Sequence, residues 1–538
     1  MKKYMKNKNL LSIIAFVGFV FIFAACSDLD TLPEGDTITS SQKENVYDLN
    51  PDRAEAGVNA IFAQFNQYMP NEAALNASRH NDFGYPSIMI FTHSNGEDVV
   101  SDNNGYNWTG GNLSYTDRVH TSLETQIVWN DFYSMIYTSN NVISTIDPET
   151  DDATNQFYLA QGLTVRAFSY FGLAQLYQFN YKGNESKPCV PIITDENAND
   201  VALEGANRST VQEVYDLILT DLNSAITLLE ASEAGGAKRA DRRYIDLATA
   251  YGIRARVHLT MHKYPEAGND AQSAINASDA KPTGPTEANK PAFMDITEKN
   301  WMWGLIVAET DRIVTSGIVN WISHMGSLNY GYANFSGGRQ INKKLFATIP
   351  ASDVRKGWWI DENKKSVNLT PDQQATMASY GYKAYTHVKF APYDNVNKNS
   401  TNANDMPLMR IEEMHLIKAE ADGMAGNNAT LVEFVKTYRD PDYSFSGTTP
   451  EAIQEEVFRQ RRIELWGEGR NWYDVMRLNK GVDRRGAGYP NATMVFNIPA
   501  GSDILLWRVP EAEIQANPSM TEADNNPSAP APNPVADY

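Results

Sequence analysis

The sequence predicts a mainly α protein, with a tetratricopeptide-like helical-repeat scaffold and long loops and short strands covering one face. Three observations predict this fold class. Apolar residues recur at helical spacing through several long segments, short helix pairs are joined by tight turns, and the segments between them are rich in Gly, Asn and aromatic residues without that period. No long linker interrupts the helical blocks of this 538-residue chain, although its length would allow two or three average domains.

Residues 1–25 are predicted to be a lipoprotein signal peptide. Four lysines precede a sixteen-residue uncharged run, residues 10–25, which is the layout of a secretory signal. As a helix this run would span about 24 Å, short of a bilayer core of about 30 Å, so a retained signal-anchor helix is the weaker alternative. Cys26 follows Ala24-Ala25 as in a bacterial lipobox, and we expect covalent diacylglycerol and an N-acyl lipid there. The alternative is a disulfide with Cys189, the other cysteine.

Residues 26–41 are polar and are expected to form a lipidated tether. Asp28 and Asp30 resemble the surface-export signal of Bacteroidetes lipoproteins. Removing residues 1–25 takes four positive charges away and changes the formal net charge from −20 to −24. So acidic a chain argues against nucleic acid as a partner and against a basic patch on anionic lipid. We expect contact with the membrane only through the lipid anchor.

The segment from residue 42 to 275 is predicted to be an N-terminal helical region. Thr210 and Glu213 have the spacing of a capping box, which marks the start of one helix. The helices expected from apolar spacing are Val128–Ile143, Phe157–Phe179, Thr210–Leu229, Arg243–His262 and Pro265–Ile275.

The last two of these helices are predicted to form a hairpin of the tetratricopeptide kind. They are joined by a short turn at residues 262–264, where Tyr264 would fill the turn. Ala267, Ala271 and Ala274 recur at helical spacing and would allow a neighbouring helix to approach closely. A similar hairpin is expected at 414–424 and 430–438. Because such units bury apolar surface against neighbours, several of them should stack.

Two segments lack helical periodicity and are predicted to be long loops with short strands. They are the binding loop 91–126 and the loop-rich region 276–405, where Gly, Asn, Ser and aromatic residues are dense. Long loops on a rigid support are where binding residues concentrate. The tail 527–538 alternates proline with small residues and is expected to be extended and mobile.

Seven motifs follow one another along about 400 residues of the chain. They are WNDFYSMIYTSNNVI (129–143), VRAFSYFGLAQLYQ (165–178), KPCVPIIT (187–194), RSTVQEVYDLILTDLNSAITLL (208–229), MPLMRIEEMHLIKAEA (406–421), QRRIELWGEGRNWYDVMR (460–477) and LLWRVPEAEIQANP (505–518). In these motifs and their order the chain resembles the SusD/RagB family of Bacteroidetes outer-membrane nutrient-binding lipoproteins. Gln460 and Asn471 depart from the family pattern, as does the ending Asn525-Asn526-Pro527, but these positions affect a helix surface and a terminus.

The resemblance implies a SusD-like fold and a non-enzymatic role. It implies a lipid-anchored outer-membrane protein, facing the cell exterior, that binds an oligosaccharide or polysaccharide and delivers it to a SusC-like TonB-dependent transporter. Residues 406–526 would form the C-terminal helical region. The alternatives are a surface glycan-processing hydrolase and a helical-repeat assembly scaffold. The sequence leaves open which glycan is bound, or whether the ligand is a peptide.

Aromatic residues within the loops are the candidate ligand-binding residues. Sugars present C–H faces to aromatic rings and hydroxyls to amides, and both kinds of partner are dense in residues 101–112 and 321–335. The alternative is that these rings pin their own loops onto the scaffold. The candidates are Asn103, Tyr106, Trp108, Trp321, Tyr330 and Tyr332.

No catalytic residue, metal site or dissociable cofactor is expected. Glu464 and Glu468 lie four residues apart among arginines, and ion pairing explains them more simply than an acid pair flanking a glycosidic bond. His258 and His262 have metal-ligand spacing on a helix, but the sequence offers no third ligand. Trp129 and Trp472 are assigned to the helical core.

Overall fold

The computed structural model describes residues 52–68, 80–317 and 319–538. The predicted signal peptide, Cys26 and the tether lie outside the described residues, so their assignments stay predictions. Residues 54–538 form one unit.

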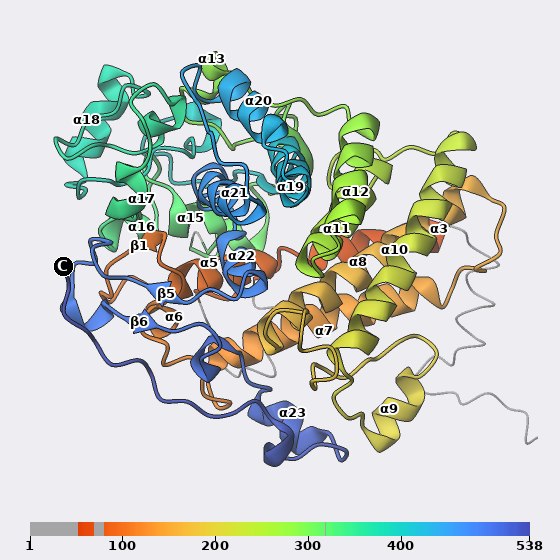
Figure 1. Cartoon of the computed structure of the whole chain (residues 1–538). Coiled ribbons are helices and arrows are strands. Elements are labelled where there is room, and N and C mark those ends of the chain that lie inside the picture. Colours follow the sequence, from red (N-terminus) through yellow and green to blue (C-terminus); the bar gives the residue numbers. More distant parts are fainter. Residues whose placement is uncertain (1–51, 69–79, 318) are drawn as a thin grey trace, which may run out of the picture. The chain divides into compact units, whose positions relative to one another are not determined.

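Long helices follow one another through this unit, each packed on its neighbour, and the predicted mainly α fold is confirmed (Figure 1). The contacts run α7–α8, α8–α10, α10–α11, α11–α12 and α12–α19, and α19 also packs on α20 and α21. The bounds of these helices are α7 (Leu123–Ile143), α8 (Ala153–Tyr177), α10 (Val211–Ala234), α11 (Leu247–Thr260), α12 (Tyr264–Ala277), α19 (Ile411–Met424), α20 (Ala429–Tyr438) and α21 (Pro450–Glu464).

Helix starts follow capping chemistry more closely than apolar spacing. The predicted capping box is present: Thr210 accepts a hydrogen bond from the backbone N–H of Glu213, whose side chain accepts one from Thr210 N–H. Helix α8 begins four residues before the expected Phe157, because Asp152 caps it and its first turn is polar. Helix α11 differs in the other direction: it begins after its cap Asp246, four residues later than the expected Arg243. The capping residues, and not the apolar period, therefore mark where these helices begin.

The hairpin α11–α12 confirms the predicted close packing. Ala267, Ala271 and Ala274 are fully buried, and α12 lies between α11 and α19. A Cβ atom built on Gly268 would stand 2.9 Å from the Cβ of Ala421, so the α12–α19 contact depends on small residues. The ring of Tyr264 stacks on His262 in the turn.

The segment 91–126 is less loop-like than predicted. Helix α5 (Tyr85–Asn95) extends into it, α6 (Gly110–Ser114) lies within it, and α7 begins inside its C-terminal end. All residues of α5 are buried, so α5 has no polar face to create an apolar period. The remaining α-helices are α3 (Asp52–Gln64), α9 (Ala198–Glu204), α13 (Pro285–Ala288), α14 (Arg312–Thr315), α15 (Trp321–Met325), α16 (Tyr332–Phe335), α17 (Lys343–Ala347), α18 (Pro371–Ser379), α22 (Asn471–Arg477) and α23 (Glu511–Ala516).

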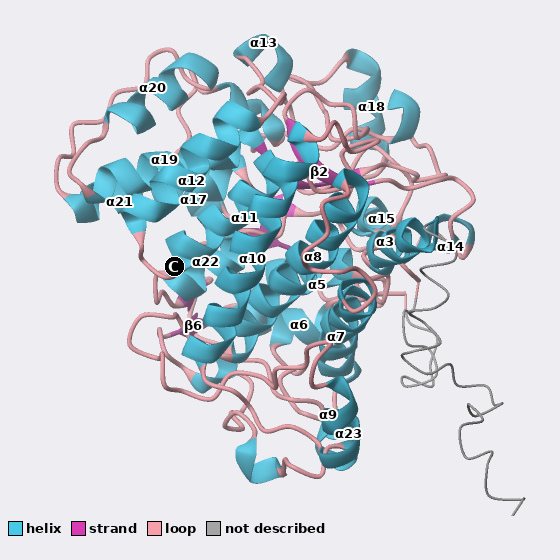
Figure 2. Cartoon of the chain, turned by 90° about the vertical axis from the view of Figure 1, so that its right-hand side faces the viewer, coloured by secondary structure: helices cyan, strands magenta, loops and turns pink. Residues whose placement is uncertain are grey.

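The strands are short and form antiparallel pairs (Figure 2). β1, β2 and β3 lie in the predicted loop regions, whereas β4, β5 and β6 lie in the C-terminal region that was expected to be helical. In the first pair Val99 lies opposite Ile341, which joins the two predicted binding loops. The pairs are β1 (Val99–Val100) with β3 (Gln340–Ile341), β2 (Trp301–Leu305) with β4 (Met406–Arg410), and β5 (Val482–Asp483) with β6 (Asn497–Ile498).

The tail after residue 526 is extended and lies against the β5–β6 region. The N–H of Val535 donates to the carbonyl of Val495 at 2.9 Å, and the guanidinium of Arg485 lies 4.9 Å from the Tyr538 ring centroid. The tail predicted to be mobile therefore makes defined contacts. Within residues 52–68, 80–317 and 319–538, no helix is both long enough and apolar enough to cross a bilayer.

Candidate functional site

The two aromatic loops singled out in the sequence lie together in the structure. Pairing of β1 with β3 brings the chain before residue 101 beside the chain after residue 339. The side chain of Asn104 strengthens this link, because its Nδ2 donates to the carbonyl of Phe335 at 3.1 Å. Its Oδ1 accepts from the N–H of Tyr106 at 3.0 Å, which fixes the turn that presents the Tyr106 ring.

Three exposed rings form what we call the aromatic patch: Tyr106, Tyr330 and Phe335. Their exposed fractions are 55%, 42% and 45%. The ring of Phe335 lies between the other two, with its centroid 5.1 Å from Tyr106 and 5.5 Å from Tyr330. Five aromatic residues in the described part of the chain are this exposed, and three of them meet here. A contiguous exposed apolar surface of this kind marks an interaction site.

A second group of rings, half-buried, continues along the same two loops. Trp108 stacks on His80 with centroids 4.8 Å apart, and Tyr332 lies edge-on to Trp108 at 6.4 Å. The hydroxyl of Tyr332 contacts Nδ1 of His80, and its ring stacks on His324 at 4.9 Å. These contacts fix Trp108 and Tyr332 in place, as a rigid stacking surface requires.

The aromatic surface carries no charge at neutral pH. Burial, and to a lesser extent Arg339, lower the pKa of His324 to about 3. Burial also lowers the pKa of His80. At one side, Lys383 pairs with Asp102 at 3.1 Å, so these opposite charges offset each other. The surface therefore suits a neutral ligand better than a charged one.

The asparagines of the first loop mainly hold the loop itself. Asn107 is buried; its Oδ1 accepts from both the N–H and the hydroxyl of Thr109, and its Nδ2 donates to the carbonyl of Asp102. Asn103 is exposed, and its Oδ1 lies 2.3 Å from the position that a Cβ on Gly110 would take. Of these amides, Asn103 is the exposed one.

The predicted exposure of Trp321 is wrong. This residue begins α15, all five residues of which are buried, and Trp321 is only 4% exposed. Its ring meets Phe390 edge-on with centroids 4.6 Å apart. The alternative interpretation, a ring that pins its own loop to the scaffold, describes Trp321. Asn, Gly and Ser around an aromatic residue do not reveal whether a short buried helix forms.

Phe335 and His80 belong to the surface but were not among the candidate residues. Phe335 lies within the second aromatic loop, so the composition of that loop could have identified it as a candidate from the sequence. His80 approaches from a distant segment and has no such signal, because only tertiary contact brings it to Trp108.

The acids of the signature motif form buried ion pairs, as predicted, but with different partners. Glu464 ends α21 and accepts from Arg439 at 2.7 and 2.8 Å, from Arg410 at 3.1 Å and from Arg355 at 3.3 Å. Burial raises its pKa, but the three arginines outweigh this and hold the pKa well below 4.5. Glu468 lies beyond the helix and pairs with Arg410 and with Lys389. Pairing within one helix was expected, whereas distant segments provide these cations.

The two histidines at metal spacing have separate partners. His258 Nδ1 lies 2.9 Å from a carboxylate oxygen of Asp270, and His262 Nε2 lies 3.0 Å from the carbonyl of Arg477. Cys189 is buried and has no disulfide partner within the described residues, and burial raises the pKa of its thiol to about 12. Trp129 and Trp472 are buried, which confirms their core assignment.

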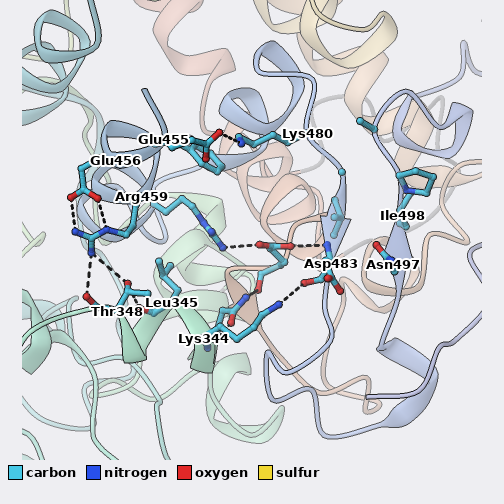
Figure 3. A pocket seen from close by; sticks show the side chains of 18 of the residues that line it. Lys344, Leu345, Thr348, Glu455, Glu456, Arg459, Lys480, Asp483, Asn497 and Ile498 are labelled. Atoms are coloured by element: carbon cyan, nitrogen blue, oxygen red, sulfur yellow. Dashed lines mark hydrogen bonds and ion pairs between the residues drawn. The ribbon is translucent and has the colours of Figure 1, made fainter. Parts of the chain in front are cut away.

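A cleft of about 790 Å³ lies between α17, α21 and the β5–β6 pair (Figure 3). Its four carboxylates each pair with a cation: Glu456 with Arg459, Glu455 with Lys480, Glu97 with Arg462 and Asp483 with Arg485. Lys344 reaches the carbonyl of Asp483 at 3.3 Å. Ion pairing therefore accounts for these charges, and the cleft presents no unpaired acids in the arrangement that glycoside hydrolysis needs.

The described elements define a mainly α protein of stacked helices that carries an uncharged aromatic surface on long loops. The sequence of this protein matches two family models. A family described as "Starch-binding associating with outer membrane" matches residues 48–259, and one described as the SusD family matches residues 321–527. The chain belongs to the SusD/RagB family.

Curated relatives and solved structures agree with this assignment. SusD-like protein P2 of Formosa agariphila is 24% identical over 74% of this chain and 79% of its own length. A SusD-like protein of Bacteroides ovatus is 22% identical over 88% of this chain and 83% of its own. A SusD-like carbohydrate binding protein from Bacteroides vulgatus has a TM-score of 0.72 at 20% identity, covering 89% of this chain and 98% of that chain. A laminarin-binding SusD-like protein has a TM-score of 0.60 at 16% identity, covering 89% and 99%. These structural likenesses establish the fold.

Proposed function

We propose that this protein binds a neutral oligosaccharide or polysaccharide on its aromatic surface, without cleaving it, and delivers it to a SusC-like TonB-dependent transporter. The observation that carries the proposal is the aromatic patch: Tyr106, Tyr330 and Phe335 are exposed, in mutual contact, and contributed by segments more than 200 residues apart. The two loops together leave these rings in contact with water. A ligand that covered the rings would remove them from water, which is favourable.

Sugar chemistry fits this surface. The C–H face of a pyranose ring packs on aromatic rings, and the ring contacts here are held by neighbouring residues before any ligand arrives. The uncharged state of His80 and His324 favours a neutral glycan over a uronate or phosphate. The carbohydrate-binding and laminarin-binding relatives support a glycan rather than a peptide.

The two carboxylates of the signature motif support binding without hydrolysis. Glu464 and Glu468, the acids most easily taken for a catalytic pair, are buried and held by Arg410 and its neighbours. A general acid needs a raised pKa and access to the substrate, whereas the pKa of Glu464 is lowered. Retention of intact glycan after incubation with the purified protein would agree with the proposal, and release of shorter products would contradict it.

The binding test compares single-ring variants by calorimetric titration. Laminarin, soluble starch and other neutral glycans are screened first, and the binder is then titrated into Tyr106→Ala and Phe335→Ala. Each ring contact contributes about 0.5–1.5 kcal/mol beyond its buried area, so each loss should weaken binding about two- to twelvefold. Tyr538→Ala, which removes an exposed ring far along the chain, is the matched control. Unchanged affinity in both patch variants, with the melting temperature intact, would refute this site.

Anchoring and delivery are tested together in outer membranes. We expect mature protein beginning at a lipidated Cys26, mass spectrometry showing the acyl chains, and co-purification with a large β-barrel protein in mild detergent. Cys26→Ser should abolish acylation and release or mislocalise the protein. A mature N-terminus elsewhere with Cys26 free would overturn the anchor, and a protein that consistently purifies alone would argue against the transporter.

A further inference from the structure

A second cleft, on the helical side of the unit, has features of a ligand site. It has a volume of about 580 Å³ and is lined by residues of α7, α9 and α23 and of the chain segments beside them. Figure 2 shows these three helices near one another at one end of the unit. This volume falls within the range of about 300–1,000 Å³ found for small-molecule sites. The residues that form the aromatic patch are absent from its lining.

One wall of the cleft is a row of aromatic rings on α7. Trp129, Tyr133 and Tyr137 recur every four residues and so lie along one side of the helix. The first two rings are in contact, with centroids 4.6 Å apart, and the hydroxyl of Tyr133 is fixed by donating to the carbonyl of Pro191 at 2.7 Å. Tyr137 is 67% exposed, although it continues the same row. From the first ring to the last, the row extends about 12 Å along the helix axis.

Polar groups in the cleft retain hydrogen-bonding capacity. The Nδ2 of Asn130 is buried and meets no acceptor within the described part of the chain, while its Oδ1 accepts from Gln126 at 2.5 Å. Glu513 accepts from Asn517 through Oε1, which leaves its second oxygen available to a donor. A buried amide N–H₂ without an acceptor costs free energy, and a ligand hydroxyl would remove this cost.

The opposite wall is held in place by a close backbone approach. Gly205, at φ 71°, ends α9, and a Cβ there would stand 2.2 Å from Oδ1 of Asn517. The same amide accepts from the N–H of Ala206 at 3.2 Å and donates to its carbonyl at 2.8 Å. These contacts tie the end of α9 to the end of α23. The cleft is therefore formed before any ligand binds.

The charge of the cleft narrows the class of ligand. Glu513 is the one charged residue among those that line it, and no lysine or arginine is present there. Phosphate, sulfate or uronate groups would meet no cation and would be repelled by Glu513. A peptide that binds by strand addition would need a free sheet edge, whereas these walls are helices and turns. Rings, amides and one carboxylate together match the C–H faces and hydroxyls of a neutral sugar.

We infer that the cleft between α7, α9 and α23 is a second binding site for a short, neutral oligosaccharide, independent of the aromatic patch. Tyr137 and Tyr133 provide the stacking surface, and Asn130 and Glu513 bind ligand hydroxyls. A protein carrying both sites would hold one polysaccharide chain at two places, which raises its overall affinity for long chains.

The test uses the full chain with the patch disabled by Tyr106→Ala and Phe335→Ala. The probes are the hexasaccharides of laminarin, amylose, cellulose, xylan and mannan, observed by saturation-transfer NMR. We expect at least one of them to bind this background. Adding Tyr137→Ala should then weaken its binding about threefold or more, and adding Asn130→Ala should also weaken it. Tyr538→Ala, another exposed tyrosine, should leave binding unchanged.

Three results would overturn the inference. The first is that no hexasaccharide binds the patch-disabled background. The second is that binding stays unchanged after both Tyr137→Ala and Asn130→Ala. The third is that Tyr137→Ala no longer co-purifies with the β-barrel protein while its saccharide binding stays intact. The last result would make the cleft a protein contact. If a hexasaccharide binds the wild-type chain but not this background, only the second site fails and the proposed function stands.

Discussion

Replacing Glu464 by glutamine tests whether the buried ion pairs of the signature motif stabilise the fold. Its two carboxylate oxygens accept from Arg439, Arg410 and Arg355, and all four side chains are almost completely buried. Glutamine keeps the size of the side chain but removes the negative charge. The three guanidinium groups would then remain buried, and only the other acids of the cluster would compensate their positive charge.

The size of the effect follows from this burial. Removing one partner of a buried ion pair costs about 3–5 kcal/mol of unfolding free energy. The unit 54–538 holds about 485 residues, and at about 2.1 cal/mol/K per residue its unfolding entropy is about 1 kcal/mol/K. The expected fall in melting temperature for Glu464→Gln is therefore about 3–5 °C.

Differential scanning calorimetry at neutral pH provides the measurement. Glu455→Gln is the matched control, because it removes the same charge from the same helix, and the Glu455 side chain is 63% exposed in its pair with Lys480. An exposed pair contributes about 0–1 kcal/mol, so this variant should melt within about 1 °C of wild type. If Glu464→Gln melted as close to wild type as the control, the argument from buried charge would be wrong.

Two further predictions concern acid stability and backbone strain. Burial raises the pKa of Glu413, but three arginines outweigh this effect and hold the pKa well below 4.5. As the pH falls, the unfolded chain therefore takes up a proton at this group before the folded chain does. The stability that Glu413 contributes is present above about pH 4.5 and is lost below it. Glu413→Gln should lower the melting temperature at pH 7 and flatten its fall between about pH 5 and 3, and an equally steep fall would contradict this. Gly467 has a backbone φ of 81°, and in Gly467→Ala the added methyl group would stand 2.7 Å from Cζ of Phe390. The left-handed backbone strain and the overpacking should together lower the melting temperature by about 2–5 °C. Gly105→Ala, in open space, should leave it unchanged, and equal melting of the two variants would refute the steric argument.

Helices whose two faces differ were predictable from the sequence. The spacing of apolar residues located α7, α8, α10 and the α11–α12 hairpin to within a few residues, and Thr210 with Glu213 fixed one helix start. These elements depend on local chemistry, namely amphipathic spacing and side-chain capping. Helix α5 was not predicted. It is buried on every side, as α8 is from Leu159 to Tyr177, but it has 11 residues against 25 in α8 and so offers a much shorter pattern.

The candidate site was predictable in part. Composition identified both aromatic loops, because Tyr106 and Tyr330 stand among glycines and asparagines that offer no local core. Composition could not distinguish an exposed ring from a buried one, and Trp321 is buried. Its neighbours in sequence resemble those of Tyr330; only its packing against Phe390, about 70 residues away, separates them.

The sequence by itself therefore determined the family, the helical class, the expected lipid anchor at Cys26 and the two loops that carry the candidate site. The tertiary structure alone decided which rings face solvent, that His80 supports Trp108, and that Arg410 rather than a helix neighbour pairs with Glu468. The physical reason is the range of the interactions. Capping and amphipathic spacing act within a few residues, whereas exposure and buried charge pairing depend on segments that meet only after the chain has folded.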